Sequence, residues 1–243
     1  SPHSIWGLLA SANSRLAASS AAELFPYLAQ QVQSGKLELP SDGSLERVIK
    51  NALQADQPAA ALALLHAAQD QKTARRQEQQ QEQPQKHRQQ QQQQQQGLSA
   101  DSLSGLLRVA ASRGHTDVVQ YLLQQDADVL PLCMDSRTPV RVNFGPSRLE
   151  PNIIIHSSVA PLVFSHIAQQ YAEGSMPVLD SRQLEVVLLE AVRCSQPDAC
   201  IRLLRTAAAW QGQTHTAAAA SAALREAAGQ GLPSVAMHVV AHH

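Results

Sequence analysis

Aromatic side chains and net charge are both scarce in this sequence of 243 residues. Aromatic residues make up 3% of the chain, and the formal net charge is −1. A nearly neutral chain has no overall electrostatic attraction to nucleic acid or to an anionic membrane surface. The shortage of Phe, Tyr and Trp argues against a β-sandwich, whose strands favour aromatic and β-branched residues. Alanine, leucine and glutamine are abundant instead, which favours short, closely packed helices.

Cysteine and long apolar runs are scarce as well. The cysteines, Cys133, Cys194 and Cys200, have no regular spacing, so we predict no disulfide framework and favour a reducing intracellular compartment, the cytoplasm or the nucleus. No run approaches the ~18 apolar residues of a membrane-spanning helix, so we expect no membrane partner. The sequence begins with Ser1 rather than Met, and we expect an excerpt or a processed form.

Glutamine dominates one segment, residues 69–97. From position 69 to position 96, Ala74 is the sole apolar residue. Such a segment cannot bury enough surface to offset the entropy of ordering its backbone. We therefore predict a disordered or transiently helical insertion. A glutamine-mediated self-association site is the functional alternative.

Residues 103–129 have the pattern of two short helices folded back on each other. Apolar residues recur at helical spacing in 103–110 and again in 118–123. Between them, Gly114 can adopt the positive φ that ends many helices. Asp117 follows in the first turn of the second helix, where the positive end of the helix dipole stabilises a carboxylate. The pattern predicts a helical hairpin.

This hairpin contains a characteristic series of dipeptides: Ala110-Ala111, Gly114-His115, Val118-Val119, Leu122-Leu123 and Ala127-Asp128. In this order they resemble an ankyrin repeat, over the length of about one repeat. The segment departs from the family where Gly105-Leu106-Leu107-Arg108 replaces the usual opening Thr-Pro-Leu-His, and where Asp126 replaces a glycine. The Thr and His that join successive repeats by hydrogen bonds are therefore missing from the opening.

The chain also contains an internal duplication. Shifted by 139 positions, residues 19–68 align with 158–207 without a gap, and 17 of these 50 positions are identical. Beyond the Gln-rich segment the shift falls to 117, so that segment absorbs most of the 22-residue difference. Hairpins within a copy recur every 36 residues, from Ala191 to Ala227, close to the ~33 of ankyrin units. Matched pairs that the composition does not explain are Phe25 with Phe164, Gly35 with Gly174, and Pro58 with Pro197.

We therefore predict an all-α fold, an α-solenoid of stacked ankyrin-like helical hairpins, internally duplicated and interrupted by a disordered Gln-rich insertion. In the second copy, we expect the helix of residues 153–171 to break near Pro161 and the last hairpin to turn at Gly229 and Gly231. The expected divisions are residues 1–68 (hairpins of module copy 1), 69–97 (Gln-rich insertion), 98–130 (ankyrin-like repeat completing copy 1), 131–152 (irregular linker) and 153–243 (hairpins of module copy 2).

Motifs of enzyme and metal chemistry are missing from the sequence. Its ten histidines form no cluster with cysteines or carboxylates at a recognised ligand spacing. We interpret Cys194 and Cys200 as small residues packed between helices. Asp56, Asp117 and Asp198 recur at hairpin turns, and we interpret them as helix-start carboxylates. We therefore predict no catalytic, cofactor-binding or metal-binding residues, and a protein that is not an enzyme.

The ankyrin resemblance implies a scaffold that binds another protein through its concave face and turn tips. Two alternatives remain. One is an RNA-binding array of the pentatricopeptide or octatricopeptide kind, against which the neutral charge and the lack of a recurring base-reading polar pair both argue. The other is the regulatory repeat region of a larger enzyme. The candidate protein-binding residues are Arg108, Ser112, Arg113, His115 and Thr116, of which Arg113 and His115 are expected to project towards the partner.

Overall fold

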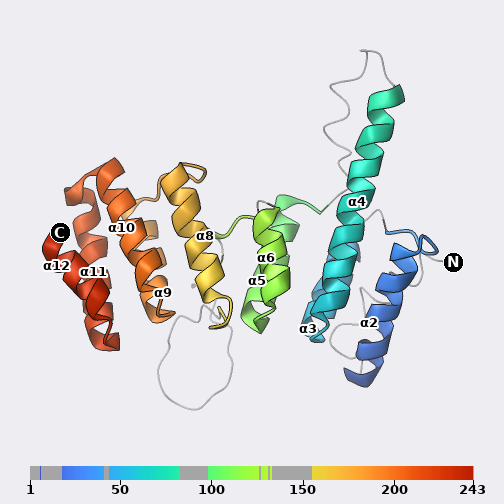
Figure 1. Ribbon diagram of the computed structural model, residues 1–243, viewed down its shortest axis with the longest axis horizontal. Coiled ribbons are helices and arrows are strands. Elements are labelled where there is room, and N and C mark those ends of the chain that lie inside the picture. The colour runs from blue at the N-terminus through green and yellow to red at the C-terminus, as the bar shows by residue number, and fades with distance from the viewer. Residues whose placement is uncertain are drawn as a thin grey trace. The chain divides into compact units, whose positions relative to one another are not determined.

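The structure of the chain is a computed structural model that describes residues 6, 18–40, 44–82, 98–125, 127–130, 132 and 155–242. In these ranges every regular element is an α-helix, and there is no strand (Figure 1). The chain divides into two compact units, Ser1–Ala127 and Asp128–His243. The prediction of an all-α fold is confirmed.

The first unit is a stack of helical hairpins. Helices α3 and α4 form one hairpin, and α5 and α6 form the next (Figure 1). The first helices of the two hairpins pack on each other, α3 on α5, and so do the second helices, α4 on α6; α2 packs on α4. This is the packing of an α-solenoid. The helix bounds are α2 (Ala18–Gln33), α3 (Ser44–Gln54), α4 (Pro58–Glu82), α5 (Ala100–Arg113) and α6 (Thr116–Gln124).

The apolar spacing of each helix determines which side is buried. In α3, Val48, Ile49 and Ala52 are fully buried and lie three to four residues apart, which places them on one face. In α5, Leu107 and Ala110 are buried in the same way. Alanine in these positions lets neighbouring helices approach closely, and burial of the adjoining leucine and isoleucine side chains stabilises the stack by about 1.5–3 kcal/mol each.

The second unit repeats this arrangement helix by helix. Helices α9 and α10 form a hairpin, and so do α11 and α12. Again the first helices pack on each other, α9 on α11, and the second helices likewise, α10 on α12, while α8 packs on α10. Each contact is the duplicate of one in the first unit. The helix bounds are α8 (Ala160–Glu173), α9 (Ser181–Arg193), α10 (Pro197–Gln211), α11 (Gln213–Gln230) and α12 (Pro233–His242).

The turns between the paired helices share one backbone geometry. In each, a residue with positive φ follows the first helix, and the next residue donates its N–H to the carbonyl of an alanine five positions earlier. This pairing is the Schellman motif that ends many helices. The sequence shifts of 139 and 117 align Asp56 with Ser195 and Gly114 with Gly231, so the aligned turns of the two units share this geometry. The positive-φ residues are Asp56 (59°), Gly114 (75°), Ser195 (55°) and Gly231 (68°), and the accepting alanines are Ala52 (2.9 Å), Ala110 (3.0 Å), Ala191 (2.8 Å) and Ala227 (2.9 Å).

Three local expectations were wrong. Pro161 does not break a helix, because α8 begins at Ala160 and a proline in the first turn has no intrahelical N–H bond to lose. Gly229 lies inside α11, and Gly231 alone forms the left-handed cap of that helix. Asp56 does not begin a helix, because it occupies the left-handed turn position, whereas Asp198 lies in the first turn of α10.

Helix α4 runs further than the sequence analysis expected. It continues through Glu82, so residues 69–82, at the start of the Gln-rich segment, are helical rather than disordered. Gln, Glu, Lys, Arg and Ala all have high helix propensity, and α4 extends through such residues without a new apolar face. The rest of that segment, 83–97, and residues 133–152 of the expected linker lie outside the described residues. The expected domain divisions stay a prediction.

Candidate functional site

The strongest candidate surface in the first unit is the exposed side of α3 and α5, here called the α3–α5 face. In α3, Arg47 and Lys50 are exposed on the side opposite the buried Val48 and Ile49. In α5, Arg108 is exposed. These three side chains make the α3–α5 face cationic, although the chain as a whole is close to neutral.

Two hydrogen bonds set the register of this face. The Ser102 hydroxyl of α5 donates to Oε2 of Glu46 in α3 at 2.6 Å. Nε2 of His115, just beyond α5, donates to the carbonyl oxygen of Leu53 near the end of α3 at 3.0 Å. The first bond joins the starts of the two helices and the second joins their ends, so α3 and α5 are parallel. With a rise of 1.5 Å per residue, a position about four residues beyond Glu46 lies beside one about four to six residues beyond Ser102.

His115 was expected to project towards a partner, and this was wrong. Its side chain is buried, with 7% of the residue exposed. Besides the bond to Leu53, its Nδ1 lies 3.7 Å from a carboxylate oxygen of Asp56 in the preceding turn. A carbonyl that lies 62 residues earlier in the chain therefore holds the ring inside the stack. His115 therefore joins one hairpin to the next. The segment Gly105-Leu106-Leu107-Arg108 lacks the Thr and His that make such hydrogen bonds in ankyrin repeats.

The other candidate residues lie nearer the surface. Arg108, Arg113 and Thr116 are exposed, and Ser112 is half-buried, with its hydroxyl donating to the carbonyl of Val109 at 2.9 Å. Arg108 and Ser112 lie one helical turn apart on α5, while Arg113 and Thr116 flank the hairpin turn. Their role as protein contacts stays a prediction.

Sequence reasoning missed Arg47 and Lys50, although a signal for both was present. Their spacing places them opposite the apolar positions of α3 on a helical projection. These cations belong to the hairpin before the best-preserved repeat, whereas the predicted contact residues all lie within that repeat. The contact between Glu46 and Ser102, which brings the two helices together, had no signal in the sequence.

The duplicated face of the second unit has different chemistry. Val186 and Leu189, both half-buried, occupy the positions of Arg47 and Lys50. A cation of this face, Arg193, is paired within the unit with Glu190 and Glu226. The two copies of the module therefore differ at these positions, which hold cations in the first unit and apolar side chains in the second.

Arg193 joins α9 to α11 through two carboxylates. Its Nη1 lies 2.9 Å from Oε1 of Glu190, one turn earlier in α9, and its Nε lies 3.2 Å from Oε1 of Glu226 in α11. The Glu190 side chain is 7% exposed. Burial raises the pKa of Glu190, and the neighbouring Arg193 lowers it less than burial raises it. This cluster is explained by packing between repeats.

Among the described residues, the cysteines are buried or half-buried and no cluster of metal-ligating side chains forms. Burial raises the pKa of Cys194 to about 11 and that of Cys200 to about 12, so both thiols are protonated near neutral pH. The described residues contain no group of three or more His, Cys, Asp or Glu side chains that could hold a metal ion. Among the same residues, no helix has the length and apolarity to cross a membrane.

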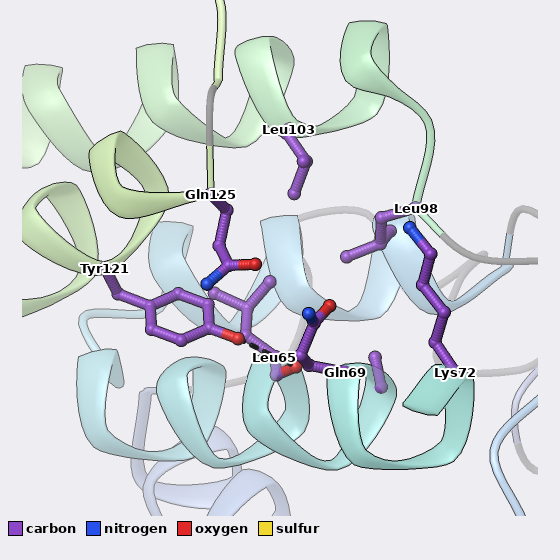
Figure 2. Close-up of a pocket in the computed structure, with 8 residues that line it drawn as sticks. Leu65, Gln69, Lys72, Leu98, Leu103, Tyr121 and Gln125 are labelled. Atoms are coloured by element: carbon purple, nitrogen blue, oxygen red, sulfur yellow. Dashed lines mark hydrogen bonds between the residues drawn. The ribbon is translucent and has the colours of Figure 1, made fainter. Parts of the chain in front are cut away.

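A small pocket of about 90 Å³ lies between α4, the start of α5 and the end of α6 (Figure 2). The Tyr121 hydroxyl donates to the carbonyl of Leu65 at 3.4 Å across it, and burial raises the pKa of Tyr121, with Asp70 adding to the effect. Side chains of Gln69 and Gln125 line it as well (Figure 2). Its volume suits a single small side chain rather than a cofactor.

The fold and its repeated turns define this chain as a helical-hairpin repeat protein. The family model of the ankyrin repeat matches residues 106–133. That segment contains the Gly114 turn, most of α5 and all of α6. Comparisons with the curated proteins and with the solved structures give no match. The chain therefore contains an ankyrin repeat, a unit that generally serves in binding other proteins, and the resemblance is confirmed.

Proposed function

We propose that this chain is a non-enzymatic scaffold that binds another protein. The contact surface is the concave face that the first helices of ankyrin hairpins form, together with the turn tips. The observation that carries the proposal is the exposed α3–α5 face. Its backbone is satisfied within the helices, its apolar side chains point into the core, and Arg47, Lys50 and Arg108 point away from it.

Four of the candidate residues stay in this proposal as contacts: Arg108, Ser112, Arg113 and Thr116. His115 is not proposed as a contact, because its buried ring is engaged with the preceding hairpin. We also propose that residues 1–68 and 98–130 form one module copy and 153–243 the other. Segment 69–97 would then be an insertion in the first copy and 131–152 a linker. The shared turn geometry of the two copies supports this division.

A pull-down from a cell extract tests the function. The full chain is the bait, with Arg108→Ala/Arg113→Ala as the test variant. Arg202→Ala/Arg205→Ala is the matched control, because both arginines are exposed on α10 and lie outside the proposed surface. We expect a protein that the wild type and the control recover and that the test variant recovers at least about tenfold less. Equal recovery by all three baits would remove these residues from the contact.

RNA binding is the competing function. A filter-binding assay with a mixed RNA at two salt concentrations separates it from protein binding. We expect no salt-sensitive affinity in the micromolar range. Binding of that strength by the wild type would contradict the proposal in favour of an RNA-binding repeat.

A further inference from the structure

We propose that the α3–α5 face recognises an acidic segment of its partner protein, with Arg47, Lys50 and Arg108 as the recognising cations. This inference rests on the proposed function and specifies the chemistry of the partner. It follows from the charges of the face, from the register of its helices and from a comparison with the duplicate.

Cations outnumber carboxylates on this face. Within the described part of the chain, Arg47 and Lys50 form no ion pair. The acidic groups of the same helices are Glu46 and Asp101, and Glu46 keeps its charge while it accepts the hydroxyl of Ser102 at 2.6 Å. A surface with three exposed cations on two adjacent helices attracts carboxylates over about a Debye length, roughly 8 Å at physiological salt.

The register of the helices brings cations from both helices together. Lys50 lies four residues beyond Glu46 in α3, and Arg108 lies six residues beyond Ser102 in α5. These are rises of about 6 Å and about 9 Å from the Glu46–Ser102 bond. Packed helices have axes about 8–10 Å apart. The two cations therefore lie at similar heights on neighbouring helices, where carboxylates one turn apart on a single peptide helix can reach both.

The duplicate shows that the fold does not need these charges. At the positions of Arg47 and Lys50 the second unit has Val186 and Leu189, and its hairpins have the same turns and helix contacts. Of the three cations, Arg108 alone has a basic counterpart in the second unit, which is Arg225, exposed in α11. Since the module folds with either set of residues, the fold does not require Arg47 and Lys50, and both are exposed for recognition.

An acidic protein segment fits this face better than RNA does. Proteins that bind single-stranded nucleic acid combine cations with aromatic side chains on which bases stack. The exposed and half-buried positions of α3 and α5 include no aromatic residue. Arginine and lysine without aromatic neighbours pair well with carboxylates.

Fluorescence anisotropy with a defined probe tests the inference. The probe is a labelled 14-residue helical peptide of Glu and Ala with Glu side chains four residues apart, and the comparison peptide has Gln for every Glu. The full chain is titrated at 50 and 300 mM NaCl. We expect the Glu peptide to bind at least about tenfold more tightly than the Gln peptide, and to lose at least about fivefold in affinity at the higher salt.

Two variants with the same change in net charge locate the binding. Arg47→Glu/Lys50→Glu/Arg108→Glu alters the α3–α5 face. Arg182→Glu/Arg202→Glu/Arg205→Glu alters exposed arginines of the second unit. We expect the first variant to lower the affinity for the Glu peptide at least about tenfold and the second to change it less than about twofold. Circular dichroism establishes that both variants fold.

Three results would overturn the inference. They are no binding of the Glu peptide by the wild type, equal loss in the two variants, and binding of a 14-nucleotide mixed RNA through the same cations in place of the peptide. The pull-down distinguishes this failure from that of the proposed function. A partner protein recovered equally by wild type and by the Arg47/Lys50/Arg108 variant overturns the acidic-segment inference alone, whereas a wild type that recovers no protein above a bait-free control overturns the scaffold function.

Discussion

Ser195 and Gly231 occupy the same left-handed position in two turns of the second unit, with φ of 55° and 68°. One has a side chain and the other has none, so opposite substitutions test one backbone geometry. We predict that Ser195→Gly stabilises the protein and that Gly231→Ala destabilises it.

The magnitude follows from two opposing terms. A residue with a Cβ is less stable by about 1–2 kcal/mol in the left-handed conformation, because the Cβ crowds the backbone. Glycine, in contrast, loses more conformational entropy on folding than alanine, which costs about 0.5–1 kcal/mol. The difference leaves about 0.5–1 kcal/mol for each substitution. A Cβ at Gly231 would meet no atom within 4 Å, so its cost comes from the backbone and not from a clash.

Urea unfolding followed by circular dichroism measures both changes. For a slope of about 1–3 kcal/mol per molar urea, each substitution shifts the midpoint by about 0.2–1 M, in opposite directions. Gly229→Ala is the matched control, because Gly229 lies inside α11 and a Cβ there also meets no atom within 4 Å. In the helix interior alanine is favoured by about 0.8–1 kcal/mol, so this variant is more stable. If Gly229→Ala and Gly231→Ala shift stability in the same direction, the reasoning about the turn is refuted.

Four further predictions concern buried groups. Arg193→Gln leaves the buried carboxylate of Glu190 without its cation and destabilises by about 2–3 kcal/mol at pH 7. Glu190→Gln is neutral or stabilising at pH 7. The pKa of Glu190 in the folded protein is raised above 4.5, so its protonated form contributes its full stabilisation below pH 4.5. That contribution is lost as the pH rises through the raised pKa. Urea unfolding at pH 4 and pH 7 checks this, and a larger gain at pH 4 would be inconsistent with it. His115→Leu removes the bond to Leu53 and lowers the unfolding free energy by about 1 kcal/mol, and an unchanged urea midpoint would count against that bond. Cys200, whose pKa is about 12, reacts with iodoacetamide at pH 8 only after unfolding; peptide mass spectrometry measures this, and rapid labelling of the native protein would disprove it.

Periodicity and turn chemistry predicted much of the fold. The apolar spacing of α5 and α6 and the turn at Gly114 follow from local rules, and the structure has both. Asp56 and Ser195 adopt the same left-handed conformation without being glycine. No single-position rule identifies them, because the cost of their conformation is offset by the surrounding hairpin. The duplication register aligns Asp56 with Ser195, which indicates that the two share one conformation but not that this conformation is left-handed.

The candidate site was predicted in part. The exposure of Arg108 and Arg113 follows from their place relative to the apolar face of α5. The burial of His115 does not, because it depends on a carbonyl of the preceding hairpin that becomes a neighbour only after stacking. The end of α4 was left open for a different reason. Its polar residues cannot form a core, which favours disorder, but they also favour the helical backbone, so the sequence predicted either a disordered or a transiently helical segment.

The connection between consecutive hairpins differs between the units, and this difference bears on the order of folding. Gly212 alone separates α10 from α11, whereas residues 83–99 separate α4 from α5. Closing a connection costs about 0.6 kcal/mol more for each doubling of its length, or about 2–2.5 kcal/mol over this range. Repeat proteins can nucleate wherever adjacent hairpins meet most easily. We therefore expect folding to begin in the second unit, with the hairpins of the first unit pairing more slowly.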